Sequence, residues 1–290
     1  MTNKYLHMDD WTDEQVSKFK EKGKDTQMSQ IEIKSGVMSF LSESSNIVSE
    51  GDSWFDYLPG TDLIDCLRNN HNYYIKNYAK AGDTLENMIY GTGIDNDFQR
   101  ISPSIENVII KIGQLRPKVF LFSGGGNDIA GEEFASYLNH KNSGLPSLRN
   151  DYIENMINTV FKKYFEDLIA KVSSTSPGTN IITHGYGHTI PTGKGVKVLF
   201  FNFSGPWLRP ALAMKGIFDA TEQKAAVEKM INAYNEMLIG LDTSNTNFHH
   251  VDLRGHIDPY NDWSNELHLK NSAYARVADI INEKIMSIQS

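Results

Sequence analysis

Five short apolar segments, separated by stretches with helical periodicity, limit the folds open to this chain. The apolar segments cover residues 46–51, 73–79, 118–124, 180–185 and 248–253. Helical patterns occupy residues 62–70, 104–115, 150–172, 222–238 and 272–288. Flanking glycines and enrichment in Val, Ile, Phe and Tyr favour strands for the apolar segments. Strands that alternate with helices indicate βαβ units, so we predict a three-layer α/β/α fold around a parallel sheet.

Composition places the chain among ordinary globular proteins and narrows its partners. The hydrophobic content is 40% over 290 residues, which is enough for a sizeable core. The 36 acidic against 28 basic residues give a net charge of −8, which argues against nucleic acid as a partner. The single cysteine, Cys66, cannot form an internal disulfide.

Domain organisation is predicted to be simple. Residues 1–45 are polar and are interpreted as an N-terminal extension, and residues 46–290 as one folded domain. The first thirty residues lack the apolar core of a signal peptide, and no run approaches the length of a transmembrane segment. We therefore expect a cytoplasmic location, with export by a route that leaves no such signal still open.

Polar residues follow each predicted strand at the edge where parallel sheets bind ligands. Ser53 comes after the first strand in "GDSW", Gly82 after the second in "AKAGD", and Asn127 after the third in "SGGGND". His184 follows the fourth strand, and His268 precedes the last predicted helix in "NELH". These residues are the candidates for a functional site.

The candidates supply each part that acyl transfer requires. Ser53 would be the nucleophile, and His268 would take its proton and return it to the leaving group. The backbone N–H groups of Ser53 and Gly82 and the amide of Asn127 would form an oxyanion hole. Gly82 suits that role because the absence of a Cβ lets its backbone approach a substrate closely.

The ordered blocks "GDSW", "NYAKAGD", "GGGND" and "NELH" resemble those of the SGNH, or GDSL, hydrolase superfamily. The resemblance implies a flavodoxin-like sheet of strand order 2-1-3-4-5. It also implies the roles given above for Ser53, Gly82, Asn127 and His268. The implied reaction is hydrolysis of an ester or thioester of an acylated small molecule, lipid or carbohydrate, with no cofactor and no metal.

One position departs from the family pattern. The family usually places an aspartate three residues before the histidine, and this chain has Asn265 there. An amide carries no negative charge, so another group is expected to orient the imidazole. Asp262 is the favoured replacement, and Glu266, or a backbone carbonyl beside a Ser53–His268 dyad, is the alternative.

Four residues are expected to line the substrate pocket, namely Trp54, His184, Tyr186 and Trp207. His184 and His188 have the spacing of metal ligands on a helix, but they flank "GYG", which is not helical, so no metal site is predicted. Asp52 is expected to bond the local backbone and to have no catalytic role.

Three other functions fit parts of the sequence. An acyltransferase would use the same acyl-enzyme with an alcohol as acceptor. A flavodoxin-like module could hold a phosphate or cofactor on the "SGGGND" loop, although the Lys-Ser/Thr of a P-loop is missing. A non-catalytic scaffold is suggested only by Asn265.

Overall fold

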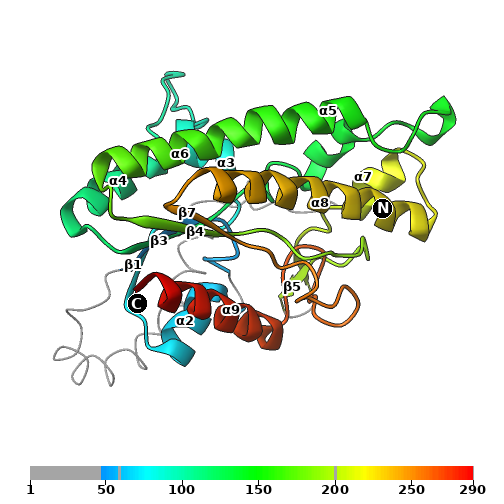
Figure 1. Cartoon of the computed structure of the whole chain (residues 1–290). Coiled ribbons are helices and arrows are strands. Elements are labelled where there is room, and N and C mark those ends of the chain that lie inside the picture. Colours follow the sequence, from blue (N-terminus) through cyan, green and yellow to red (C-terminus); the bar gives the residue numbers. More distant parts are fainter. Residues whose placement is uncertain (1–46, 58–59, 199–200, 290) are drawn as a thin grey trace.

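A five-stranded parallel sheet forms the centre of the molecule (Figure 1). The computed structural model describes residues 47–57, 60–198 and 201–289, so the predicted extension, residues 1–45, lies outside the described residues. The strands run in the order β2-β1-β3-β4-β7, and all neighbouring pairs are parallel. Their bounds are β1 Ile47–Gly51, β2 Ile75–Asn77, β3 Val119–Ser123, β4 Asn180–His184 and β7 Phe248–Val251. The predicted strand order 2-1-3-4-5 is confirmed, with β7 as the fifth strand of the sheet.

Helices cover both faces of this sheet, which confirms the three-layer prediction. Helices α2 and α9 lie on one face, and α3, α4, α6 and α8 lie on the other (Figure 1). The helix bounds are α2 Leu63–His71, α3 Leu85–Tyr90, α4 Ser104–Leu115, α5 Asn150–Asn155, α6 Lys162–Thr175, α7 Arg209–Met214, α8 Ala220–Ser244 and α9 Asn271–Gln289. A π-helical turn, Met156–Phe161, joins α5 to α6, so the helix predicted over residues 150–172 is one continuous element. None of the described helices has the length and apolar character needed to span a bilayer.

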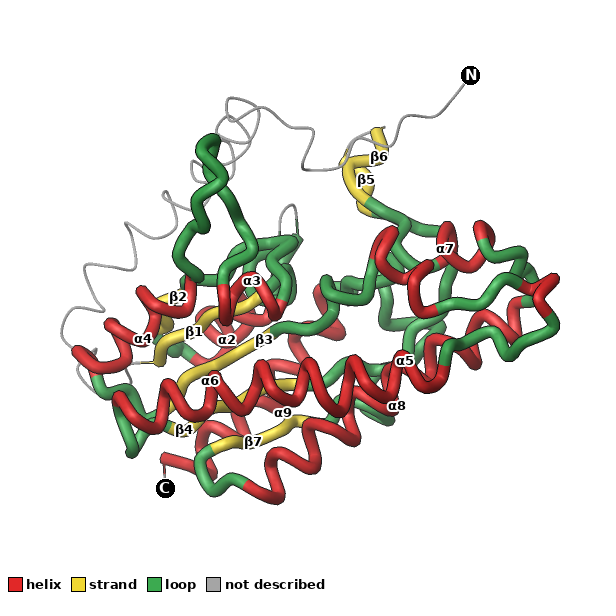
Figure 2. Tube along the Cα trace, turned by 90° about the horizontal axis from the view of Figure 1, so that it is seen from above, coloured by secondary structure: helices red, strands yellow, loops and turns green. Residues whose placement is uncertain are grey.

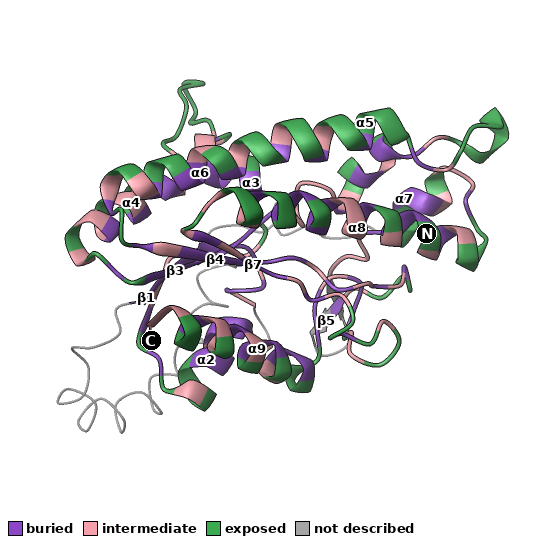
Figure 3. Ribbon diagram, in the orientation of Figure 1, coloured by how far each residue is buried: buried purple, intermediate pink, exposed green. Residues whose placement is uncertain are grey.

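In β3 the residues from Val119 to Phe122 are all apolar because helices bury both faces of the sheet. Phe120 and Phe122 point toward α4, α6 and α8, whereas Val119 and Leu121 point toward α2 and α9. Figure 3 shows the resulting buried residues along the strands and the inner faces of the helices. This two-sided burial explains why the sequence shows apolar runs instead of alternation.

The connection from β4 to α8 carries an addition to the basic fold. Two short antiparallel strands, β5 Val196–Val198 and β6 Phe201–Ser204, lie within it and pair only with each other among the described strands. Figure 2 shows this pair away from the central sheet. Residues 186–218, which contain these strands, form a long segment interrupted by Gly and Pro, and its sequence predicts no strand.

Glu50 is the one acidic residue inside a central strand. Its side chain is fully buried on β1, and one carboxyl oxygen accepts a hydrogen bond from the backbone N–H of Gly51 at 3.1 Å. The other oxygen has no partner among the described residues. Burial, together with the smaller effect of the charge of nearby Asp83, raises the pKa of Glu50 to about 8. Glu50 is therefore protonated in the folded protein at neutral pH.

We expect Glu50→Gln to remove a pH dependence of stability. Between about pH 4.5 and pH 8 the folded chain holds a proton at Glu50 that the unfolded chain has lost, so the wild type loses stability as pH rises. The slope at stake is up to about 1.4 kcal/mol per pH unit. In urea unfolding at pH 5, 6, 7 and 8, the free energy of unfolding of the variant should rise relative to that of the wild type at each step. The control Glu106→Gln, at an exposed position of α4, should show the pH dependence of the wild type. If the free energy of unfolding changes equally with pH in all three proteins, Glu50 is not the buried proton-binding group.

Candidate active site

Ser53 and His268 meet at the carboxyl edge of the sheet, although 215 positions separate them in sequence. The Oγ atom of Ser53 lies 2.7 Å from Nε2 of His268. Ser53 stands in the tight turn that follows β1, where the N–H of Phe55 donates to the carbonyl of Asp52. His268 lies just before α9, beside the bridge that pairs Trp263 with Leu269. The fold therefore brings a hydroxyl and an imidazole into hydrogen-bond contact, as a serine nucleophile and its base require.

Asn265 is the residue that holds the other side of the imidazole. Its Oδ1 atom lies 3.1 Å from Nδ1 of His268. The same oxygen accepts the backbone N–H groups of His268 and Leu267, at 2.9 and 3.0 Å. This is an Asx turn, a geometry that asparagine and aspartate form equally well. The amide therefore keeps the orienting contact and lacks only the charge.

The expectation that Asp262 orients His268 is wrong in the structure. The Oδ2 atom of Asp262 pairs with the guanidinium of Arg276 at 2.5 Å and accepts the backbone N–H of Asp258 at 2.7 Å. These contacts hold Asp262 at the start of the loop that leads to His268. The backbone N–H of Lys270, just after that loop, also donates to the carbonyl of Asp262. Asp262 holds the ends of the loop together and leaves the ring to Asn265.

Glu266 also contacts neither ring nitrogen of His268. Its buried carboxyl group accepts four backbone N–H groups from the connection between β4 and α8. The donors are Gly193, Trp207, Leu208 and Arg209, at 2.7–3.2 Å. Burial raises the pKa of Glu266, and these donors oppose that shift. Glu266 thus ties the loop that carries His268 to the segment that covers the pocket.

The predicted oxyanion donors lie in two segments that hydrogen bonds hold together. Nδ2 of Asn127 donates to the carbonyl of Asp83 at 2.8 Å, which leaves its second hydrogen available. Asp128 accepts the N–H groups of Leu85 and Glu86 at the start of α3. Burial raises the pKa of Asp128 to about 6, and these two N–H groups oppose the rise. The loop after β3 is therefore fixed against the turn that contains Gly82.

Gly82 has the backbone conformation that its predicted role requires. It is the third residue of a turn closed by the N–H of Asp83 and the carbonyl of Lys80, and its φ is +83°. A Cβ at this position would meet no atom within 4 Å, so the space beside its backbone is open. Among the described residues, the N–H groups of Gly82 and Ser53 have no hydrogen-bond acceptor. Both are free to bind an oxygen of a ligand.

Sequence comparison identifies the family of this chain. The model for GDSL-like lipases and acylhydrolases matches residues 35–281. This chain is a member of the GDSL-like family. A search among curated protein sequences gave no match.

Solved structures resemble this chain at low sequence identity, and one of them, with a TM-score above 0.5, shows the same fold. The lipase Lip_vut3 from a goat rumen metagenome is 11% identical, with a TM-score of 0.52 over 83% of this chain and 97% of that one. A family 3 carbohydrate esterase from Clostridium thermocellum is 13% identical, with a TM-score of 0.46 over 84% and 97% of the two chains. The periplasmic domain of a lipopolysaccharide acetyltransferase from Salmonella ser. Paratyphi A is 14% identical, with a TM-score of 0.49 over 83% of each chain.

The imidazole of the GDSL-like site is buried among rings. The ring of Tyr57 stacks on that of His268 with centroids 4.1 Å apart and planes 17° apart. The ring of Trp207 lies on another side, at 5.5 Å and 69°. Burial lowers the pKa of His268 to about 3. The ring is therefore neutral at physiological pH and able to accept a proton.

We expect the activity of this site to persist into acid. A base with a pKa of about 3 stays unprotonated above that pH, so kcat/KM should hold its plateau to about pH 4. In Asn265→Asp the new carboxylate beside Nδ1 should raise the pKa of His268 and move the acid limb to higher pH. Short assays from about pH 3.5 to 8, with folding checked at each pH, test both statements. A wild-type limb near the ordinary histidine pKa, or identical limbs in the two proteins, would contradict them.

A pocket extends from Ser53 and Asn127 toward α8. Trp54 and Tyr186 line it, as the sequence analysis expected. His184 does not: it is buried behind Trp54, with the two rings stacked at 4.7 Å. Trp207 is also absent from the lining and instead contacts the ring of His268. Every residue of β4 from Ile181 to His184 is buried, so this histidine belongs to the core.

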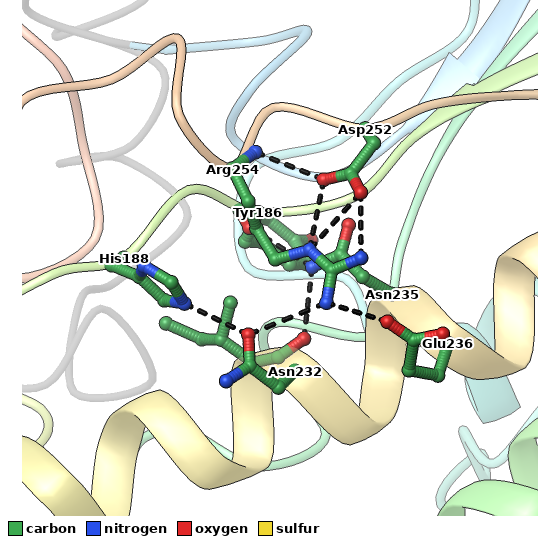
Figure 4. Close-up of polar contacts among 8 residues, drawn as sticks. Tyr186, His188, Asn232, Asn235, Glu236, Asp252 and Arg254 are labelled. Carbon is green, nitrogen blue, oxygen red and sulfur yellow. Dashed lines mark hydrogen bonds and ion pairs between the residues drawn. The ribbon is translucent and has the colours of Figure 1, made fainter.

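A polar network fixes the segment after β4 against α8, as Figure 4 shows. Nδ2 of Asn235 donates to the carbonyl of Tyr186 at 3.0 Å, and Nε2 of His188 lies 2.8 Å from Oδ1 of Asn232. Arg254 also reaches Asn232, and it forms ion pairs with Asp252 and Glu236. Through these contacts the wall of the pocket is held in place. Within the described part of the chain, no group of three His, Cys, Asp or Glu side chains could hold a metal.

Asp52 forms a structural hub of hydrogen bonds next to Ser53. One oxygen accepts the backbone N–H of Trp54 at 3.0 Å, as the sequence predicted for this turn, and also the hydroxyl of Ser123 at 2.7 Å. The other oxygen accepts the hydroxyl of Tyr186 at 2.9 Å. The same tyrosine oxygen accepts the N–H of Gly126 at 3.1 Å. Asp52 thereby joins the loops after β1, β3 and β4.

Sequence reasoning missed two residues of this site. Tyr57 gave no signal, because a single tyrosine in a loop has many possible contacts. Asn265 stood at the position where the family carries its orienting acid, but the missing charge directed attention to Asp262 instead. The geometry of the Asx turn was the available signal, since it depends on the side-chain oxygen and not on the charge.

Proposed function

We propose that this GDSL-like chain is a serine hydrolase that cleaves an ester or thioester through an acyl-enzyme on Ser53. The observation that supports this most is the 2.7 Å contact between Ser53 Oγ and His268 Nε2, beside three N–H donors with free hydrogens. A nucleophile, a base and an oxyanion hole in one place are the parts of acyl transfer.

In the proposed mechanism, Asn265 holds Nδ1–H of His268, so that the lone pair of Nε2 faces Ser53. As Oγ bonds to the carbonyl carbon, its proton passes to Nε2, and the negative oxygen is bound by the N–H groups of Ser53, Gly82 and Asn127. His268 then gives the proton to the leaving oxygen or sulfur. Water repeats the steps on the acyl-enzyme, which releases the free acid and restores Ser53.

The proposal is tested by the products formed from p-nitrophenyl butanoate, with and without glycerol. We expect nitrophenol and free butanoate in equal amounts, with glycerol changing the result little. Butanoyl glycerol as the main product would identify an acyltransferase instead. No turnover of any activated ester or thioester by folded protein would overturn the proposal.

A further inference from the structure

The pocket beside Ser53 has an apolar wall built from three separate parts of the chain. The loop after β3, the start of α7 and one face of α8 contribute to it. The apolar residues that matter most here are Ile129, Phe134, Leu208, Val227, Met230 and Ile231. Because the pocket begins at the nucleophile and at Asn127, a group that occupies it would be attached to the reacting carbonyl or lie next to it.

Apart from Ser53 and Asn127, which lie where the reacting carbonyl would bind, the polar side chains that line the pocket are already paired within the protein. The hydroxyl of Tyr186 bonds Asp52 and Gly126, and that of Tyr234 donates to the carbonyl of Gly124. The hydroxyl of Thr189 donates to the carbonyl of Glu266, whose own carboxyl group holds four N–H groups. A sugar would lose its hydrogen bonds to water in such a pocket and gain none in return.

We infer that this pocket binds an unbranched aliphatic acyl group longer than acetyl, which specifies the acyl part of the substrate. This inference rests on the proposed hydrolase function. Each methylene moved from water into the pocket should raise kcat/KM roughly fourfold until the pocket is filled. The alcohol part of the ester would lie toward solvent and contribute less to selectivity.

The test compares p-nitrophenyl acetate, butanoate, hexanoate and octanoate. We expect wild-type kcat/KM to rise from acetate to at least hexanoate. Met230→Trp, which fills the pocket from α8, should lower the octanoate-to-acetate ratio by about tenfold or more, and Met230→Ala should shift the optimum to a longer chain. Ala225→Trp, on the exposed side of the same helix, should match the wild type.

Labelling by a small fluorophosphonate separates failure of this inference from failure of the proposed function. A protein that labels and hydrolyses acetate best, or in which Met230→Trp lowers all esters equally, would overturn the acyl-chain inference alone. A folded protein that neither labels nor hydrolyses any ester would overturn the function itself. If Met230→Trp does not fold, the chain-length shift of Met230→Ala decides.

A second inference concerns the charge that Asn265 does not supply. When His268 takes the proton of Ser53 it becomes a cation, and no carboxylate among the described residues contacts its ring. The face of Tyr57 lies parallel to that ring at 4.1 Å, and the hydroxyl of Tyr57 accepts a hydrogen bond from Nδ2 of Asn265 at 3.3 Å. Gly60 allows this packing, because a Cβ there would lie 2.6 Å from Cε1 of Tyr57.

We propose that Tyr57 acts through His268 by two contacts. This proposal also rests on the proposed hydrolase function. Its ring face stabilises the imidazolium by a cation–π interaction, in place of the family's carboxylate. Its hydroxyl fixes the Asn265 amide with Oδ1 toward Nδ1, because Nδ2 is held on the other side. The ring supports the charged state of His268, and the hydroxyl supports its orientation.

A double-mutant cycle tests this role. We expect Tyr57→Leu to lower kcat about tenfold with little change in KM, and Tyr57→Phe, which keeps the ring, to lower it much less. In an Asn265→Asp background the same Tyr57→Leu change should cost about threefold or less, since the carboxylate would neutralise the imidazolium. Equal losses in both backgrounds, or equal losses for Leu and Phe, would overturn the proposal.

Discussion

Ser53→Ala is expected to lower kcat/KM for an activated ester by roughly 10⁴-fold to 10⁶-fold. The variant keeps the oxyanion donors and the pocket but has no oxygen to attack the carbonyl carbon, so no acyl-enzyme can form. His268→Ala should cost about as much, because the serine hydroxyl is a weak nucleophile without its base. Steady-state kinetics on p-nitrophenyl butanoate, with the burst of nitrophenol recorded, measures both losses.

The controls for this prediction use non-additivity and a distant serine. The double variant Ser53→Ala/His268→Ala should be no slower than either single variant, since the two residues act as one unit. Ser143→Ala, at an exposed serine, should retain full activity. A Ser53→Ala protein with more than about a tenth of wild-type kcat/KM would mean that the contact with His268 has another purpose.

Glu266→Ala is expected to lower the free energy of unfolding by about 3–5 kcal/mol. The reason is that four backbone N–H groups would lose an acceptor whose own side chain is fully buried. Glu266→Gln should cost less, because one amide oxygen can still accept from two of the donors. Thermal unfolding should show a fall in Tm of about 10 °C for the alanine variant and a smaller one for glutamine.

Activity provides a second readout of the Glu266 variants. Glu266 shares a loop with His268 and anchors Trp207, whose ring contacts His268, so kcat/KM should fall in both variants at temperatures where they remain folded. Glu166→Ala, which removes only an exposed contact with Lys162, should change the free energy of unfolding by less than about 1 kcal/mol. A Glu266→Ala protein as stable as that control would contradict the anchoring role.

Most of the fold was predictable because the sequence patterns reflect burial. The apolar run at residues 118–124 and its glycine-rich flank predicted β3, and the helical period at residues 104–115 gave α4 with the observed bounds. Helix α3 escaped prediction because it has only six residues, too few for a period to show. Strands β5 and β6 escaped because they pair only with each other among the described strands and are not part of the central sheet.

The candidate site was predictable where a residue's position after a strand fixes its place in space. Ser53, Gly82 and Asn127 follow three adjacent strands, so the topology alone brings them to one edge. The role of Asp262 could not be decided in this way. The path of the 257–268 loop depends on tertiary contacts, here those of the Asp262 side chain with Arg276 and with the backbone of Asp258. The position of His184 could not be predicted for the same reason. Tertiary packing places its ring behind Trp54 and not in the pocket.

The sharpest test of Ser53 as the nucleophile is to locate the covalent bond that a reactive phosphorus compound forms with the protein. The full chain should be treated with a fluorophosphonate and digested, and the modified peptide should be sequenced by mass spectrometry. We expect one phosphonyl group per chain, on Ser53, and much slower labelling in His268→Ala. A label on another serine, or equal labelling rates in the wild type and His268→Ala, would contradict it.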